Sequence, residues 1–246
     1  MRYMLLSILI LTLAACAIPV DAPPDPTQIV AVPTEQTVPT LIVAPPTLTV
    51  ASATPVVAPS LPSEISLNDV PALLASMPES ANSNLCQDTR GLQLLLDLQK
   101  VIQTRDGSLF ALLVNPASGM GVRYIRDGNI ITYFDNIKFI FETTYAADWG
   151  LAAGSGMPVQ GSFQEIVLPS LERVFSSNPL VTCNQLKTGG ATYNPTFPYS
   201  DMDYYSIHFP GSEQYGYLDW ETWVVGVVQQ DDKPMLAALI RFAWEP

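Results

Sequence analysis

The sequence predicts an α+β domain over residues 64–246, in which N-terminal helices pack on a curved antiparallel sheet. Helical patterns come first in this region and long strand patterns come last, the order typical of helices that cover one face of a sheet. Hydrophobic residues make up 48% of the 246 residues and charged residues 14%, so the region can bury a sizeable core. The proline excess lies elsewhere, because eleven of the 22 prolines fall between residues 17 and 63.

The first residues have the pattern of a bacterial secretory signal. Arg2 precedes an apolar run over residues 4–15, which is shorter than the roughly 20 residues needed to span a bilayer. The run ends in Leu-Ala-Ala-Cys at residues 13–16, which resembles a bacterial lipobox, whose cysteine is diacylated and becomes the new N-terminus. We therefore expect a signal peptide over residues 1–15 and a lipid anchor at Cys16, on the extracytoplasmic side of the bacterial cell envelope. The alternative is an ordinary signal peptide that happens to contain a cysteine.

Residues 16–63 are expected to form a disordered stalk that begins at the lipidated cysteine. From residue 17 onward the segment has seven threonines and no Lys, Arg, Gly or aromatic residue. Proline fixes φ and removes a hydrogen-bond donor, so neither helix nor sheet can propagate, and little can be buried without aromatic side chains. In polyproline II conformation, at about 3.1 Å per residue, the stalk would reach roughly 145 Å.

The charge balance excludes one class of partner. The chain has 23 acidic and 11 basic residues, for a formal net charge of −12. Nucleic acid binding needs a basic surface, so we expect no nucleic acid partner. Anionic lipid headgroups should also repel the domain, so the lipid anchor, and not the protein surface, would hold it at the membrane.

The domain is expected to open with three helices. A short helix spans residues 66–77, with Pro71 tolerated near its first turn. Residues 91–104 have apolar side chains at a spacing of 3.6 residues and form the clearest helix. An aspartate cap begins the third helix, over residues 106–113, and a turn follows at residues 115–119.

The middle of the domain mixes several elements. Residues 121–134 are predicted to form a β-hairpin around an Asp-Gly turn, and residues 135–143 a further helix. Residues 149–158 are rich in glycine and are predicted to form a loop. A capping-box sequence, Ser-Phe-Gln-Glu, opens a helix over residues 162–175 that should kink at Pro169.

The end of the chain is expected to be β-structure. Three strand candidates are residues 204–209, 218–229 and 235–244. The polar residues 230–234 predict a hairpin turn between the last two. Twelve aromatic residues fall between residues 193 and 244, which suits a sheet core and also a surface for sugar or peptide binding. Trp220 and Trp244 would favour a binding site if both pointed into one cavity.

The cysteines and the single histidine limit the possible chemistry. Once Cys16 is lipidated, Cys86 and Cys183 remain as a pair in an exported protein, so a disulfide is expected between them, with two buried thiols as the alternative. With one histidine and no Cys-x-x-Cys sequence, we expect no metal site. The sequence has neither a phosphate-binding loop nor a dinucleotide-binding fingerprint, and we expect no cofactor.

His208 is the candidate for acid–base catalysis. It would need a nucleophile within reach and a carboxylate to orient it, for which Asp201, Asp203 and Asp219 are nearby in sequence. A single histidine among aromatic residues is more often packed and hydrogen-bonded, and we favour that interpretation. Asp219 also lies two residues from Glu221, as a glycosidase carboxylate pair could, but an exposed polar strand face explains this spacing better.

Several motifs together resemble an uncharacterised family of bacterial exported proteins and lipoproteins. The resemblance covers residues 90–246 and rests on the order of these motifs: Arg105-Asp106, a Pro-x-x-Gly turn at 116–119, Trp149-Gly150, Gly154-Ser155-Gly156, Pro158, His208-Phe209-Pro210-Gly211, Asp219-Trp220 and Trp244. Relatives of that family often have basic residues where this chain has Glu221-Thr222-Trp223, so a shared basic site is not implied. The family has no assigned activity, and the resemblance therefore implies no catalytic residue.

The layout of the domain also resembles the nuclear-transport-factor-2-like cone. In that fold N-terminal helices wrap a curved sheet, and the final strands carry a hairpin that residues 232–236, Asp-Lys-Pro-Met-Leu, match. The resemblance implies an enclosed pocket that many members use for binding and some for catalysis. A shared fold does not by itself fix the function.

The function that the sequence favours is a non-enzymatic binding module for a small molecule, a glycan or an envelope protein, held off the membrane by its stalk. A hydrolase or isomerase that uses His208 with a nearby aspartate is one alternative. A structural envelope protein without a cavity is the other.

Overall fold

The computed structural model describes residues 61–245, so Cys16, the expected signal peptide and nearly all of the expected stalk lie outside the described residues. The strands are β1 Glu64–Ser66, β2 Met120–Arg123, β3 Ile131–Tyr133, β4 Ala147–Leu151, β5 Pro158–Gly161, β6 Leu180–Cys183, β7 Asp203–Phe209, β8 Glu221–Gln230 and β9 Lys233–Ala243. The α-helices are α1 Val70–Ser76, α2 Thr89–Thr104, α3 Gly107–Leu113 and α4 Leu168–Ser176. No helix between residues 61 and 245 is long and apolar enough to cross a membrane.

Seven strands form one mixed sheet in the order β1-β6-β7-β8-β9-β2-β3, and β4 pairs with β5 in a separate hairpin. Neighbouring strands of the large sheet are antiparallel except β2 and β9, which run parallel with Gly121 opposite Ala238. The fully antiparallel sheet expected from the sequence is therefore wrong at this pair. β2 has only four residues, too few for its side-chain pattern to reveal its direction.

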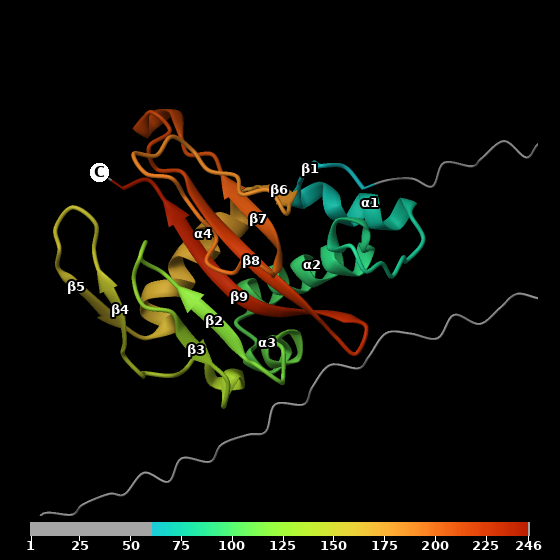
Figure 1. Ribbon diagram of the computed structural model, residues 1–246, viewed down its shortest axis with the longest axis horizontal. Coiled ribbons are helices and arrows are strands. Elements are labelled where there is room, and N and C mark those ends of the chain that lie inside the picture. Colours follow the sequence, from blue (N-terminus) through green and yellow to red (C-terminus); the bar gives the residue numbers. More distant parts are fainter. Residues whose placement is uncertain (1–60, 246) are drawn as a thin grey trace, which may run out of the picture. The chain divides into compact units, whose positions relative to one another are not determined.

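The helices cover one face of this sheet (Figure 1). α2 and α4 contact strands β7, β8 and β9. Alternate side chains of the strands, such as Trp223, Val225 and Leu239, point into the core shared with the helices, where Leu95 and Leu98 of α2 are fully buried. An α+β fold with helices on one face of a sheet is the class that the sequence predicts.

The opposite face of the sheet is covered by the long connection between β6 and β7, residues 184–202. Strand side chains that point away from the helices, such as Val224, pack against Phe197 and its neighbours in this connection. The Trp220 indole N–H fixes the connection by donating to the Gly190 carbonyl (2.8 Å). Both faces of the central strands are therefore buried, whereas the sequence predicted a cover of helices on one face.

Two helical segments begin at the capping residues that the sequence predicts. The Asp106 side chain accepts hydrogen bonds from the N–H groups of the second and third residues of α3 (2.9 and 3.0 Å). Ser162 and Glu165 form the expected capping box. The element that follows is a π-helix, Phe163–Val167, that leads into α4 with Pro169 in its first turn, so the irregularity falls before the proline.

Two expectations for the middle of the chain need correction. The expected loop at residues 149–158 is wrong at both ends, which belong to β4 and β5. Trp149 anchors this hairpin, because its ring is fully buried and its indole N–H donates to the Gly161 carbonyl (3.0 Å). Residues 135–143 contain the 3₁₀ turn Ile137–Phe139 in place of the expected helix. The strands β1 and β6 were also missed, since neither exceeds four residues.

Cys86 and Cys183 are joined by a disulfide, with their Cα atoms 5.5 Å apart. Cys86 lies in the 3₁₀ turn Leu85–Gln87 before α2, and Cys183 ends β6. The bond therefore links the helical layer to the sheet. A cross-link between residues 97 positions apart restricts the unfolded chain, which stabilises the fold.

Candidate functional site

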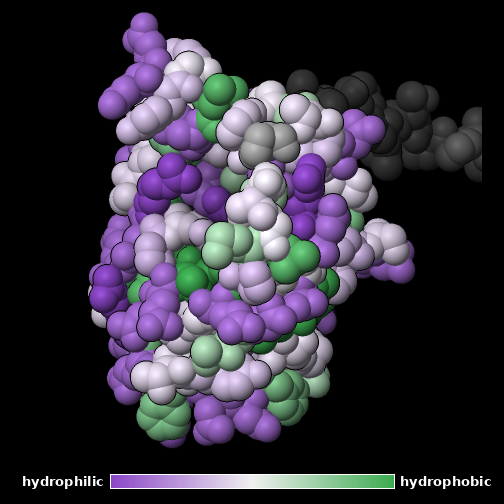
Figure 2. Space-filling model, turned by 90° about the vertical axis from the view of Figure 1, so that its left-hand side faces the viewer, coloured by the Kyte–Doolittle hydropathy of each residue, from purple (hydrophilic) through white to green (hydrophobic). Residues whose placement is uncertain are grey.

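A cavity of about 700 Å³ lies between α4, the start of β8, the end of β9 and the β4–β5 hairpin. Its polar wall consists of Ser170 and Arg173 from α4, Glu221 from β8 and Arg241 from β9. Trp244 follows β9 at its border. Figure 2 shows the side of the domain that carries the β4–β5 hairpin, where hydrophobic side chains lie recessed between hydrophilic ones.

Glu221 is the centre of the polar network in this cavity. Its side chain is 0% exposed and forms ion pairs with Arg173 and Arg241. The Ser170 hydroxyl donates a hydrogen bond to Glu221 and accepts one from the Trp223 indole (2.9 Å). Two guanidinium groups and a hydroxyl thus compensate for the burial of this carboxylate.

The network keeps its charges at neutral pH. Burial favours the neutral form of Glu221, but Arg241, Ser170 and Arg173 outweigh burial and hold the pKa of Glu221 below its ordinary value. Burial also opposes the charge of Arg241, whereas the Glu221 carboxylate keeps the pKa of Arg241 above its usual range. A general acid needs a raised carboxyl pKa. The network is therefore a fixed arrangement of charge and not a proton donor.

Aromatic rings complete the cavity. The Arg241 guanidinium lies 4.5 Å from the ring centre of Tyr124, and Trp244 is 37% exposed at the border. Glu245, also in the wall, is ion-paired with Arg126 (2.9 Å). Flat rings beside a few fixed polar groups are typical of sites for small polar molecules, including sugars.

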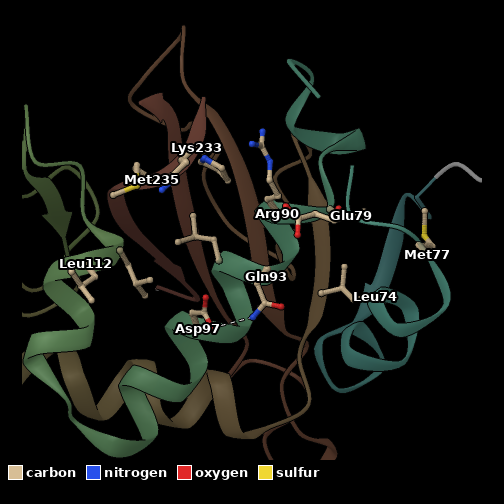
Figure 3. A pocket seen from close by; sticks show the side chains of 13 residues that line it. Leu74, Met77, Glu79, Arg90, Gln93, Asp97, Leu112, Lys233 and Met235 are labelled. Atoms are coloured by element: carbon tan, nitrogen blue, oxygen red, sulfur yellow. Dashed lines mark hydrogen bonds between the residues drawn. The ribbon is translucent and has the colours of Figure 1, made fainter. Parts of the chain in front are cut away.

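A second hollow, of about 490 Å³, lies between α1, α2, α3 and the start of β9 (Figure 3). Its polar side chains pair mainly within and just before α2, although Arg90 also donates to the Asp232 carbonyl in the β8–β9 turn. Gln93 donates to Asp97 (3.0 Å), and Arg90 donates to Asp88 (2.9 and 2.6 Å). Gln93 and Asp97 lie four residues apart and stabilise α2 itself, and Asp88 is the N-cap of the same helix. The network around Glu221 instead joins side chains from three distant elements, so the cavity beside Glu221 is the stronger candidate.

His208 lies on the sheet face beneath residues 184–202 and not in this cavity. It is 3% exposed, and its Nδ1 lies 2.8 Å from Thr222 Oγ1, which donates its proton to the Lys187 carbonyl (2.7 Å). Nδ1 therefore carries the proton and donates to Thr222. Burial, with a contribution from Lys187, lowers the pKa of His208 to about 4. This packed arrangement does not favour the hydrolase or isomerase alternative.

The aspartates that were candidates to orient His208 have other partners. Asp203 is exposed and accepts a hydrogen bond from an asparagine side chain (2.7 Å). Asp219 accepts hydrogen bonds from Ser212 N (2.7 Å) and Ser212 Oγ (3.0 Å), and Asp201 is exposed. In the part of the chain that the structure describes, no aspartate hydrogen-bonds to His208.

The two candidate tryptophans do not share a cavity. Trp220 packs beneath residues 184–202, with its ring centre 6.2 Å from that of His208, whereas Trp244 borders the cavity on the helical side. The exposed polar face expected at Asp219 and Glu221 is also wrong, because Glu221 is buried against α4.

Arg173, Arg241 and the burial of Glu221 are absent from the sequence-based predictions. A signal existed for Arg241, since it interrupts the apolar strand β9, where a charged residue is seldom buried unless it is paired. Glu221 begins β8 and gives no such signal. No local pattern indicates that Arg173, 48 positions away, meets Glu221. Between residues 61 and 245 no group of three or more side chains could hold a metal ion.

No protein-family model matches the chain, and no curated protein matches it. Among solved structures, a crystal structure described as a calcium/calmodulin dependent protein kinase II association domain from Xanthomonas campestris matches with 14% sequence identity and a TM-score of 0.24. The match covers 68% of this chain and 96% of that chain. The likeness is weak, and a TM-score this low supports no argument about function.

Proposed function

We propose that the protein is a lipid-anchored lipoprotein of the bacterial cell envelope and that its domain is a non-enzymatic binding module. Cys16 would carry the lipid, and residues 17–63 would hold the domain away from the membrane. The cavity beside Glu221 would bind a small polar molecule or a glycan. The observation that supports binding is a fixed network of charges on the wall of a cavity of about 700 Å³.

The same cavity supports a further proposal about the fold, namely that the domain is a nuclear-transport-factor-2-like cone. Such a cone has a helical layer over one face of a sheet and a pocket within it. Here α2 and α4 cover one face, and the cavity lies between α4 and the ends of β8 and β9. The parallel pairing of β2 with β9 adds a feature that the sequence resemblance did not imply.

The chemistry of the cavity favours binding over catalysis. Glu221 stays ionised and is fully engaged by its partners, so it can orient Arg173 and Arg241 but cannot donate a proton. Polar groups held in place before a ligand arrives bind it without a large ordering cost. The ring of Trp244 adds a flat face on which a sugar could stack.

Binding is tested by thermal unfolding of the full chain with separate panels of sugars, cell-wall fragments, lipids, peptides and metal ions. A ligand at a hundred times its Kd adds about 2.7 kcal/mol, or roughly 5–10 °C in Tm for a domain of this size. We expect a shift from one chemical class that is lost in Trp244→Ala. Tyr215→Ala is the matched control, because this ring is exposed outside the cavity. No shift from any class would contradict the proposal and favour a structural envelope protein.

The lipid anchor is tested separately, by growing bacteria that make the full chain with an alkyne-labelled fatty acid. We expect the label on the wild-type protein and on Cys86→Ala, and no label on Cys16→Ala. A wild-type protein without label, or a label retained in Cys16→Ala, would rule out the anchor while leaving the binding proposal open.

A further inference from the structure

A small cavity of about 150 Å³ contains a buried arginine without a partner. Its lining consists of Arg123, Arg126, Asp127, Tyr193, Asn194, Thr196 and Phe242. Arg123, at the end of β2, is 8% exposed, and its Nε is buried with no hydrogen-bond partner among residues 61–245. None of the ion pairs formed within that range includes Arg123.

This arrangement differs from that of the other arginines on β-strands and helices. Arg241 and Arg173 share Glu221, and Arg90 is paired with Asp88. A guanidinium group buried without a carboxylate is costly, because it loses water and gains no opposite charge. For Arg123 this burial lowers the pKa below its ordinary value, and the nearby Asp127 carboxylate offsets the shift only in part.

The nearby aromatic ring does not replace the missing anion. The Arg123 guanidinium carbon lies 5.5 Å from the ring centre of Phe242, a distance at which a cation–π contact is weaker than a hydrogen-bonded ion pair. The Tyr193 hydroxyl is already used, since it donates to the Ala243 carbonyl (3.0 Å). The charge of Arg123 therefore remains available to a group that enters the cavity.

We propose that this cavity binds a phosphate group or a chemically similar small oxyanion. A guanidinium pairs with two oxygens of such a group at once. The Asn194 amide, on the exposed side of the cavity, supplies further donors. The Thr196 hydroxyl, also exposed, donates a long hydrogen bond to the Asn194 carbonyl (3.4 Å), which it would exchange for one to the anion. The volume is well below the roughly 300–1,000 Å³ of sites for whole organic ligands, so only the anionic group of a larger molecule would enter.

Two other charged residues of the cavity wall, Arg126 and Asp127, act on a bound anion in opposite directions. Arg126 adds positive charge but is paired with Glu245 (2.9 Å). Asp127 lies 3.7 Å from Arg126 and its side chain is 88% exposed, so solvent and salt screen its repulsion of an anion.

The experiment titrates the full chain with sodium phosphate at constant ionic strength, with sodium chloride in place of phosphate as the reference, and follows Tm and the ³¹P linewidth. We expect a saturable rise in Tm and a broadened ³¹P signal for the wild type. Both effects should be lost in Arg123→Met and kept in Arg105→Met, which removes an exposed arginine paired with Glu172. Should Arg123→Met not fold, Thr196→Ala should still show binding weakened several-fold.

A parallel titration with glycerol 3-phosphate separates two sources of the oxyanion. Binding at least tenfold tighter than that of inorganic phosphate would indicate a phosphate carried on a lipid headgroup or polymer, and equal binding would indicate the free ion. No saturable effect beyond that of chloride, or an unchanged effect in Arg123→Met, would overturn the proposal. This outcome is independent of ligand binding in the cavity beside Glu221.

Discussion

Lowering the pH from 7 to 5 should destabilise the folded protein through His208. The chain has one histidine, and the folded-state pKa of about 4 lies well below the 6.5 of an unperturbed imidazole. Between these values the unfolded chain binds a proton at His208 and the folded chain does not. The contribution to stability is therefore complete above pH 6.5 and is lost as the pH falls toward 4. At pH 5 the free energy of unfolding should be about 2 kcal/mol lower than at pH 7.

The assay is thermal unfolding of the full chain at the two pH values. A loss of about 2 kcal/mol corresponds to a decrease in Tm of roughly 4–8 °C. His208→Gln keeps a hydrogen-bonding group beside Thr222 and does not titrate. The Tm of this variant should be nearly the same at both pH values, because no histidine remains to titrate. Each protein is compared only with itself, so a different stability of the variant at pH 7 does not affect the test.

Two results would refute this reasoning. One is a wild-type Tm that does not change between pH 7 and pH 5, and the other is an equal decrease in His208→Gln. A single histidine also gives a single imidazole signal in NMR, whose titration midpoint should lie near 4. A midpoint near 6.5 would mean that water reaches the ring, since burial is the main cause of the shift.

Three further predictions concern the ion pairs of Glu221, the disulfide and the packing at Gly189. Glu221→Gln should lower the free energy of unfolding by about 3–5 kcal/mol in denaturant titrations, because two guanidinium groups lose their buried carboxylate; a loss below about 1 kcal/mol would count against the network. Replacing Cys86 and Cys183 together by serine should cost up to about 4–5 kcal/mol, the upper value for a loop this long. Gly189→Ala should lower Tm by several degrees, because its Cβ would lie 2.2 Å from a buried indole, whereas Gly190→Ala meets nothing within 4 Å; equal effects would contradict the packing.

Local signals in the sequence were sufficient where an element is stabilised by its own residues. Asp106 caps α3 and Ser162 opens its capping box because each side chain bonds to backbone groups within three residues. The β8–β9 hairpin turns at Asp231 and Asp232, both at positive φ, in the conformation that two-residue hairpin turns favour. Elements of this kind depend on few distant contacts.

The rest of the fold depends on contacts between distant residues. Residues 184–202 contain no helix or strand, and their place is set by bonds such as Trp220 to Gly190 and Thr222 to Lys187. The aromatic residues of this segment looked suited to a sugar or peptide site, but several pack against the sheet. Such a segment has no periodicity from which its position could be predicted.

The network around Glu221 was not predicted from the sequence, because residue type alone favours His208 as the functional residue. Histidine is the residue most often used for acid–base catalysis, and a chain with one histidine makes it conspicuous. The chemistry of the cavity instead comes from residues whose roles exist only after folding. Arg241 faces the helical layer because it lies opposite Trp223 in the β8–β9 pair, and Glu221 does so because it lies two residues before Trp223 on the same strand.

The ion pair between Arg126 and Glu245 connects the two cavities, because Glu245 lines the cavity beside Glu221 and Arg126 lines the one beside Arg123. Glu245→Gln would remove the carboxylate that pairs with Arg126, so the positive charge of Arg126 would attract an anion in the smaller cavity more strongly. We expect phosphate binding by this variant to be several-fold tighter than by the wild type in the same titration at constant ionic strength.

Glu172→Gln is the matched control for Glu245→Gln, since it frees Arg105, which does not line the smaller cavity. It should leave phosphate binding unchanged, because Arg105 lies outside the cavity and solvent screens its exposed charge. Unchanged or weaker binding in Glu245→Gln would show that Arg126 contributes nothing to the site, and Arg123 would then be its sole charged ligand. Equal gains in both variants would instead mean that phosphate responds to the net charge of the chain and not to the geometry of the cavity.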